Sequence, residues 1–226
     1  MSHFISTFKL LLLLLVSLNT FAQVKVDKTV ATRYEMEFKK MKLIYQQKIL
    51  PFQEKEPFIG ISVFTSYKVD TLNKKEIIDF GNDVIVEDIN PSLNKISEEE
   101  TDENVYSPVF SRAKLINDTL YLDVGGPFPP IIHHKVYLGN VISNYEEYYK
   151  YDSVLRLNLK DTKASKLFIP IKTKKFLISA STYKAEQVIY GQVEFETVPY
   201  YYDTYGFKNN YIKKRLRGVY LFKVRV

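Results

Sequence analysis

The chain of 226 residues contains no cysteine and no tryptophan. The absence of cysteine excludes disulfide bonds, thiolate nucleophiles, zinc sites built on cysteine and the lipidated N-terminal cysteine of a bacterial lipoprotein. The fold must therefore be stabilised by packing, and a chain of this length can bury roughly 70% of its unfolded surface without cross-links.

Motifs of the common enzyme classes are also missing. There is no Walker loop, no dinucleotide-binding glycine fingerprint, no His-Glu-x-x-His and no nucleophile elbow. Among the three histidines, His133 and His134 are neighbours, and adjacent side chains on a strand point to opposite faces. This spacing does not suit joint chelation, so we predict no metal site and no cofactor. The ordinary arrangement is one packed and one solvated histidine, and the alternative is one acting as a general base.

The longest apolar run lies near the start of the chain. Lys9 precedes the block Leu10–Val16, and small residues at Thr20 and Ala22 suit cleavage before Gln23. The block is shorter than the roughly 20 residues that cross a bilayer. We therefore predict that residues 1–22 are a signal peptide and that the chain has no transmembrane span.

Removal of this segment leaves residues 23–226, which we expect to form a single β-rich domain. The net charge then falls from +6 to +5, because the segment holds one lysine and no acid. An exported chain without cysteine is typical of a bacterial envelope, so we expect a periplasmic or secreted protein of a Gram-negative bacterium. The charges are interspersed along most of the chain, which predicts no nucleic-acid binding.

The first mature residues show the spacing of an amphipathic helix. Apolar residues recur at intervals of three and four until Pro51 ends the pattern. These residues are Val30, Tyr34, Phe38, Met41 and Tyr45. The spacing predicts one N-terminal helix.

From Phe58 onward the apolar period changes to two, which indicates strands. Turn residues Asn117, Asp118 and Thr119 predict a tight hairpin. Residues 90–104 are acidic and nearly without apolar side chains, so we expect a solvated loop; the ligand spacing of a calcium loop is missing there. The pattern as a whole predicts about ten strands in an antiparallel β-sandwich or an open β-barrel, and a calycin-like barrel also satisfies it.

Glu194 and Glu196 form the best pair of carboxylates for acid–base chemistry. Residues two apart on a strand share a face at roughly 6–7 Å, within the range of glycosidase pairs. This pair defines one hypothesis, a glycan hydrolase. The alternative is a solvated strand face, because neighbours on one strand tend to share an environment.

Tyrosine is abundant, with 18 residues. Exposed tyrosines suit the binding of sugars, peptides or a protein partner, whereas buried ones fill strand faces. Two groups stand out, one within residues 145–151 and the other within residues 200–205. The candidate binding residues in these groups are Tyr148, Tyr149, Tyr151, Tyr200, Tyr201 and Tyr202.

Three triplets resemble the Asp-Ser/Thr-hydrophobic acceptor of O-glycosylation in some Gram-negative bacteria. They would place O-glycans on Thr71, Thr119 and Ser153. The same residues also suit an ordinary turn that leads into a strand.

Three functions follow from these patterns. The first is an exported, non-catalytic β-domain that binds a protein, glycan or envelope component through tyrosine-rich surfaces. The second is the glycan hydrolase that uses Glu194 and Glu196. The third is a secreted or periplasmic inhibitor or immunity-type protein, which is a special case of the first.

Overall fold

The structure is a computed structural model. It describes residues 22–41, 43, 46–47, 59–73, 75–78, 84–87, 97–100, 108–125, 130–203 and 211–226. The strands and the helix within these ranges are β1 (Ala22–Val26), α2 (Val30–Lys40), β2 (Gly60–Asn73), β3 (Lys75–Ile78), β4 (Val84–Glu87), β5 (Ser97–Glu100), β6 (Pro108–Ile116), β7 (Thr119–Gly125), β8 (Ile131–Tyr137), β9 (Asn140–Tyr148), β10 (Leu155–Arg156), β11 (Lys166–Ile178), β12 (Val188–Thr197), β13 (Tyr200–Asp203) and β14 (Tyr211–Arg225).

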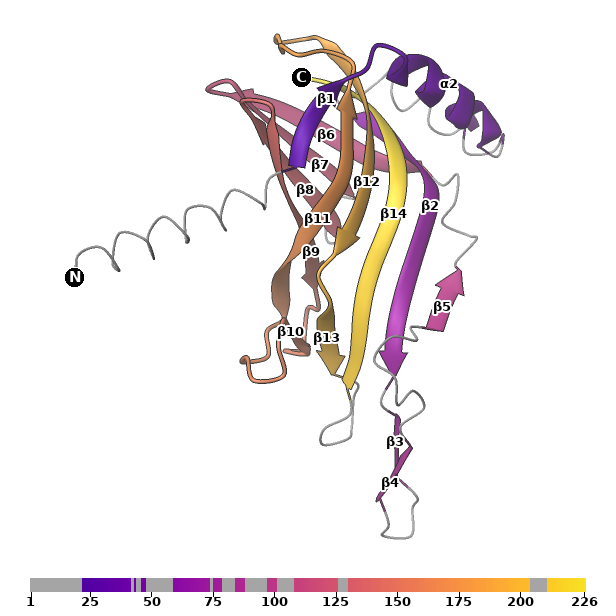
Figure 1. The fold of residues 1–226 in the computed structure, drawn as a ribbon, viewed down its shortest axis with the longest axis vertical. Coiled ribbons are helices and arrows are strands. Elements are labelled where there is room, and N and C mark those ends of the chain that lie inside the picture. The colour runs from indigo at the N-terminus through magenta and orange to yellow at the C-terminus, as the bar shows by residue number, and fades with distance from the viewer. Residues whose placement is uncertain are drawn as a thin grey trace, which may run out of the picture.

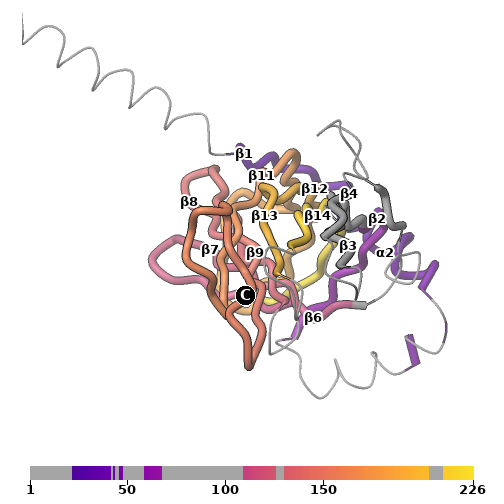
Figure 2. Tube along the Cα trace, turned by 90° about the horizontal axis from the view of Figure 1, so that it is seen from below, coloured from indigo at the N-terminus to yellow at the C-terminus, as the bar shows by residue number. Residues whose placement is uncertain are grey.

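Eight long strands pair in chain order and close on themselves. The sequence β2-β6-β7-β8-β9-β11-β12-β14 is antiparallel at every step, and β14 pairs with β2 to complete the ring. Figure 1 shows the ring from the side, and Figure 2 shows it along the strands. The prediction of a mainly β fold is therefore confirmed.

The alternation of side chains divides each strand between an interior and an exterior face. On β12 every second residue from Ile189 to Thr197 is buried, and the residues between them are partly exposed. The interior holds one large apolar cluster that includes Phe176, Phe195 and Phe222. Because these side chains fill the interior, they stabilise the ring mainly through the apolar area they remove from water.

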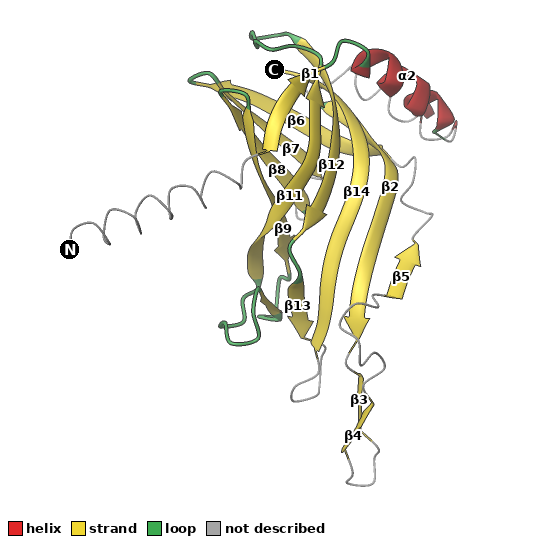
Figure 3. Ribbon diagram, viewed as in Figure 1, coloured by secondary structure: helices red, strands yellow, loops and turns green. Residues whose placement is uncertain are grey.

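The helix α2 covers the outside of the ring over β2, β12 and β14 (Figure 3). Its Val30 and Tyr34 are buried against outward-facing residues such as Ile61 and Leu221, and the Tyr34 ring lies 5.6 Å from that of Tyr190. The helix ends at Lys40; Tyr45 and Pro51 lie outside the described residues.

β1 fills a gap in the ring. β9 and β11 pair directly only between Lys166–Ile171 and Ser143–Tyr148. Beyond this stretch β1 lies between them, parallel to β11 over Val24–Val26 and antiparallel to β9 at Ala22 and Gln23. This short strand gives the separated edges of β9 and β11 a pairing partner.

The structure differs from the sequence prediction in several strands. Ser97–Glu100, assigned above to a solvated acidic loop, forms β5 beside β2, because backbone pairing does not require apolar side chains. Lys166–Ile178 forms one long strand, β11, with a register shift between Thr173 and Lys175. Within the described residues, no helix combines the length and apolar character needed to cross a bilayer.

Gly191 is a point where the interior tolerates no added atom. A Cβ at this position would lie 2.1 Å from Cζ of Phe222 and 2.8 Å from the carbonyl oxygen of Leu177. We predict that Gly191→Ala lowers the free energy of unfolding by about 1–3 kcal/mol, measured by urea denaturation. Gln192→Ala is the control on the opposite face. A second change, Phe222→Leu, should recover part of the loss; an unchanged midpoint for Gly191→Ala would contradict the described packing.

Candidate binding site

The two tyrosine groups meet at one end of the ring. Tyr145 and Tyr149 come from β9 and the residue that follows it, and Tyr200 and Tyr202 come from β13. The ring centroids of Tyr145 and Tyr200 are 6.4 Å apart, and those of Tyr149 and Tyr202 are 5.0 Å apart. We call this region, together with Tyr67 and Glu147, the tyrosine end.

Glu147 lies among these rings. It shares a strand face with Tyr145 and Tyr149, and its Oε2 accepts a hydrogen bond of 3.2 Å from the Tyr200 hydroxyl. Among the described residues no lysine or arginine lies within ion-pair distance of Glu147, and the partners of its carboxylate there are phenol groups. An interior carboxylate without a cation is costly unless hydrogen bonds or a ligand compensate it.

The tyrosines around Glu147 remain protonated at ordinary pH. Burial, the larger cause, and the charge of Glu147 together raise the pKa of Tyr67 and of Tyr149 to about 12. The same two causes raise the pKa of Tyr145 and Tyr200. These hydroxyls therefore act as hydrogen-bond donors.

A small cavity adjoins the tyrosine end. Its volume is about 200 Å³, and its lining is largely apolar. Tyr67 and Tyr145 belong both to this lining and to the surroundings of Glu147, and Phe64 and Ile132 form other walls. The cavity and the carboxylate are therefore neighbours.

Five of the six predicted binding residues divide into three kinds. Tyr200 is 2% exposed and belongs to the core, contrary to its assignment to a binding surface, because β13 continues the line of β12 beside β14. Tyr149 and Tyr202 are half-buried at the tyrosine end. Tyr148 faces outward and Tyr151 is 83% exposed in the following loop.

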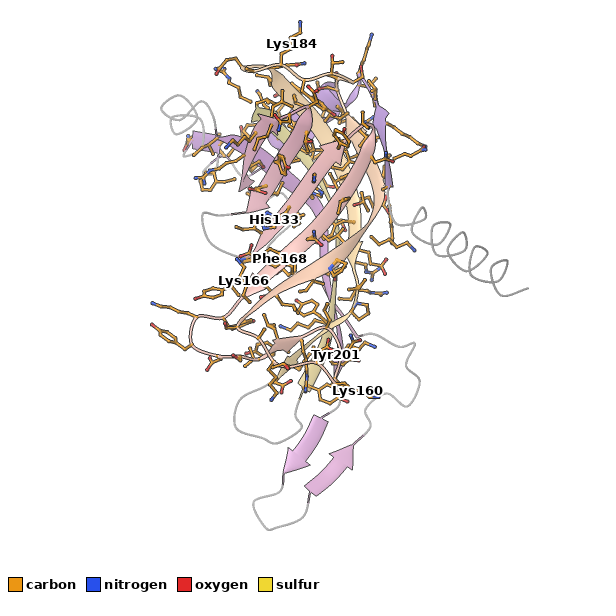
Figure 4. The ribbon with its side chains drawn as sticks, turned by 90° about the vertical axis from the view of Figure 1, so that its left-hand side faces the viewer. His133, Lys160, Lys166, Phe168, Lys184 and Tyr201 are labelled. Atoms are coloured by element: carbon orange, nitrogen blue, oxygen red, sulfur yellow. The ribbon has the colours of Figure 1, made fainter. Side chains whose placement is uncertain are left out.

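Tyr201 is the remaining predicted residue. It points away from Tyr200, with its ring 5.4 Å from that of Tyr211 and with Lys213 Nζ 5.6 Å from its centroid. Figure 4 shows it at the same end as Lys160 and opposite to Lys184.

Glu194 and Glu196 share the outer face of β12, but Glu196 is already paired. Its carboxylate lies 2.7 Å from Lys174 Nζ and 2.9 Å from Arg215 Nη1. The hydrogen bond from Lys174 is the first cause that lowers the pKa of Glu196. An ionised carboxylate with two cationic partners is a poor general acid.

His133 lies on the outer face of the ring among charged groups. Figure 4 shows it near Lys166 and Phe168. Its Nδ1 is 2.7 Å from Asp123 Oδ1, and its Nε2 is 3.0 Å from Glu146 Oε2. Lys166 Nζ lies 2.7 Å from the other oxygen of Glu146. The hydrogen bond to Asp123 is the main cause that raises the pKa of His133, and Glu146 adds to it against the opposing effect of burial.

His134 points into the ring, as the alternation predicts. It is 1% exposed, its Nδ1 lies 2.6 Å from Ser143 Oγ, and its Nε2 hydrogen-bonds with the Tyr220 hydroxyl. Ser143 Oγ continues to Thr173 Oγ1 at 2.9 Å. Burial lowers the pKa of His134 to about 3, with His133 adding to the effect. This network joins β8, β9, β11 and β14.

The three predicted glycan acceptors have different surroundings. Thr119 is buried at the start of β7, and its hydroxyl is directed to the Asn117 carbonyl oxygen, so the structure does not favour a glycan there. Ser153 is exposed in the loop before β10. The side chain of Thr71 lies outside the described part.

A comparison of the chain with protein-family models, curated proteins and solved structures finds no match. Across the described ranges, no three His, Asp or Glu side chains are grouped so as to hold a metal ion. Sequence reasoning missed Glu147, although the alternation Tyr145, Glu147, Tyr149 places it on the tyrosine face of one strand.

The two histidines predict opposite pH effects on stability. The folded state keeps His134 neutral, so below pH 6.5 the unfolded state binds more protons and stability falls as the pH falls. For one such group the slope is about 1.4 kcal/mol per pH unit. We expect His134→Gln to remove this slope between pH 5 and 6.5, measured by urea denaturation at stepped pH. An unchanged slope would contradict the buried neutral histidine.

His133 serves as the comparison. Its pKa is raised in the folded state, so its contribution is full below pH 6.5 and is lost as the pH rises through the folded value. In the same experiment His133→Asn should flatten the decline above pH 6.5 and leave the slope between pH 5 and 6.5 in place.

Proposed function

We propose that the mature chain is an exported, non-catalytic binding protein whose partner contacts the tyrosine end. The observation that carries this proposal is the convergence of two tyrosine groups, about 50 residues apart in sequence, on Glu147 and a neighbouring cavity. In this proposal the closed ring is an eight-stranded barrel with a filled interior, and it holds the tyrosine end in a fixed shape.

The chemistry of the tyrosine end favours a partner that presents a cation or a strong hydrogen-bond donor. Glu147 is an acceptor whose described partners are uncharged, and aromatic faces attract cations, as Lys214 Nζ at 4.7 Å from the centre of the Tyr202 ring shows. A lysine or arginine side chain of a protein, or an amino group on a glycan, has this chemistry. An inhibitor or immunity-type protein would be one case of such binding.

The competing hydrolase proposal receives less support. Glu196 is held ionised by Lys174 and Arg215 on the outer face of the ring, whereas a glycosidase needs one carboxyl group that stays protonated. The pair also borders neither of the cavities at the ends of the ring.

The binding experiment compares two adjacent glutamates that face opposite sides of β9. Mature protein is immobilised and tested against a glycan array and an envelope extract, with affinities of retained components measured by calorimetry. We predict that Glu147→Gln weakens binding about tenfold or more, because a hydrogen bond to a charged group contributes about 1.5–3 kcal/mol. Tyr149→Ala and Tyr202→Ala should weaken it as well.

Glu146→Gln is the matched control, because this residue lies on the outer face with Lys166 and His133. Its affinity should equal that of the native chain. Equal losses in the two glutamine variants, or a loss that follows melting temperature, would reject the tyrosine end as the binding surface. Turnover of a cell-wall glycan that Glu196→Gln abolishes would favour the hydrolase instead.

Export is supported by the predicted signal peptide. Cleavage before Gln23 would remove Ala22 from β1 but keep the pairs of Val24, Lys25 and Val26 with β11. We predict that the chain expressed in a Gram-negative host is recovered outside the cytoplasm with Gln23 as its first residue, as read by mass spectrometry of the intact protein. Recovery of uncleaved chain in the cytoplasm would contradict the prediction.

A further inference from the structure

The opposite end of the ring contains a larger cavity. We call this end the turn end; it carries the turns at Asn117-Asp118 and Leu138-Gly139 and the loop Ser179–Gln187, which includes Lys184 in Figure 4. The cavity has a volume of about 450 Å³, within the roughly 300–1,000 Å³ of small-molecule sites. β1 forms one of its sides.

The walls of this cavity are mainly aliphatic and uncharged. Their side chains come from four strands, β1, β6, β8 and β11, and from the β8–β9 turn, and they are Val24, Val26, Leu115, Val136, Leu138 and Ile178. The polar groups of the lining are concentrated in the β11–β12 loop at Ser181, Thr182 and Tyr183, with Asp118 as its one carboxylate. The cavity therefore has an apolar wall and a polar side.

Leu138 occupies a position that local physics disfavours. It has φ = 48° in a two-residue turn with Gly139, and it is 77% exposed. Such turns prefer Asn-Gly or Asp-Gly, because a leucine is strained at positive φ. The other tight turn at this end has Asn117 and Asp118 at φ 46° and 59°, residue types that suit this geometry.

Leu138 thus lowers the stability of the fold in two ways: its backbone is strained, and its apolar side chain is exposed to water. It does so at the rim of an apolar cavity, where Val26 is also 50% exposed. A ligand that covers Leu138 and Val26 would offset the second of these costs.

We propose that the turn end binds the acyl chain of a fatty acid or lipid, with Leu138 contacting the chain and the ligand's head group near Ser181, Thr182 and Tyr183. The occupant is apolar along most of its length because the wall is aliphatic. The polar loop residues supply hydroxyl groups for the oxygen atoms of a carboxyl or ester. This site is independent of the tyrosine end.

The test uses the mature chain and 11-(dansylamino)undecanoic acid, a fluorescent fatty acid. Saturable binding of one probe per chain is expected, with displacement by palmitic acid and by monopalmitoylglycerol but not by hexanoic acid. Displacement by the acid alone or by the glycerol ester alone would identify the head group, and either supports an acyl-chain site.

The Leu138→Asn variant distinguishes an effect on probe binding from an effect on the stability of the fold. Asparagine suits the turn, so the variant should melt at the same temperature as the native chain or higher, yet bind the probe about tenfold more weakly because one leucine contact is lost. Ala180→Phe should also reduce binding by filling the cavity that Ala180 lines. Leu159→Asn, an exposed leucine in the loop between β10 and β11, is the matched control and should bind normally.

Three results would overturn the proposal. The first is the absence of saturable probe binding that either palmitic acid or monopalmitoylglycerol displaces. The second is a dimer in sedimentation analysis that Leu138→Asn dissociates, which would make the turn end a contact between two copies. The third is sedimentation with phospholipid vesicles without binding of free fatty acid. Glu147→Gln should leave probe binding unchanged, so failure here and failure at the tyrosine end are distinguishable.

Discussion

The pairing of β14 with β2 is the constraint on which the rest of the structure depends. It extends from Ile212 opposite Asn73 to Lys223 opposite Ile61, and it joins the last long strand of the meander to the first. Once the ring is closed, neighbouring residues on a strand lie on opposite sides of a wall. Glu146 faces a lysine and a histidine outside, whereas Glu147 faces tyrosines inside. The same wall separates His133, whose pKa is raised, from His134, whose pKa is lowered.

Side chains fill the interior of the ring. Tyr220, His134, Ser143 and Thr173 form a hydrogen-bonded chain across the ring, and the rings of Phe176 and Phe222 lie beside it. A buried polar network with satisfied partners stabilises one arrangement of the strands. A tyrosine, a histidine and a serine in contact would suggest a catalytic site if they were accessible. Here their burial makes them a structural element.

Sequence patterns predict the parts of this fold that depend on neighbours along the chain. The alternation of apolar and polar residues identifies β12 and predicts that His133 and His134 lie on opposite faces of their strand. Turn residues identify the hairpin at Asn117 and Asp118. Contacts between segments that lie far apart in the sequence cannot be predicted from the residues near either segment. Nothing near Tyr200 signals its burial against Tyr145, and nothing near Glu196 signals Arg215 from β14. The candidate site is accordingly visible in sequence as two tyrosine groups, without Glu147 at their centre.

β1 precedes the other described strands in the chain, but the strands it pairs with come much later in the sequence. Its partners, β9 and β11, end at residues 148 and 178, and the ring closes only when β14 has been synthesised. Contacts of such long sequence separation slow folding, because the chain must close large loops before they form. The topology therefore leaves the ring open until its C-terminal strand, β14, is in place beside β2.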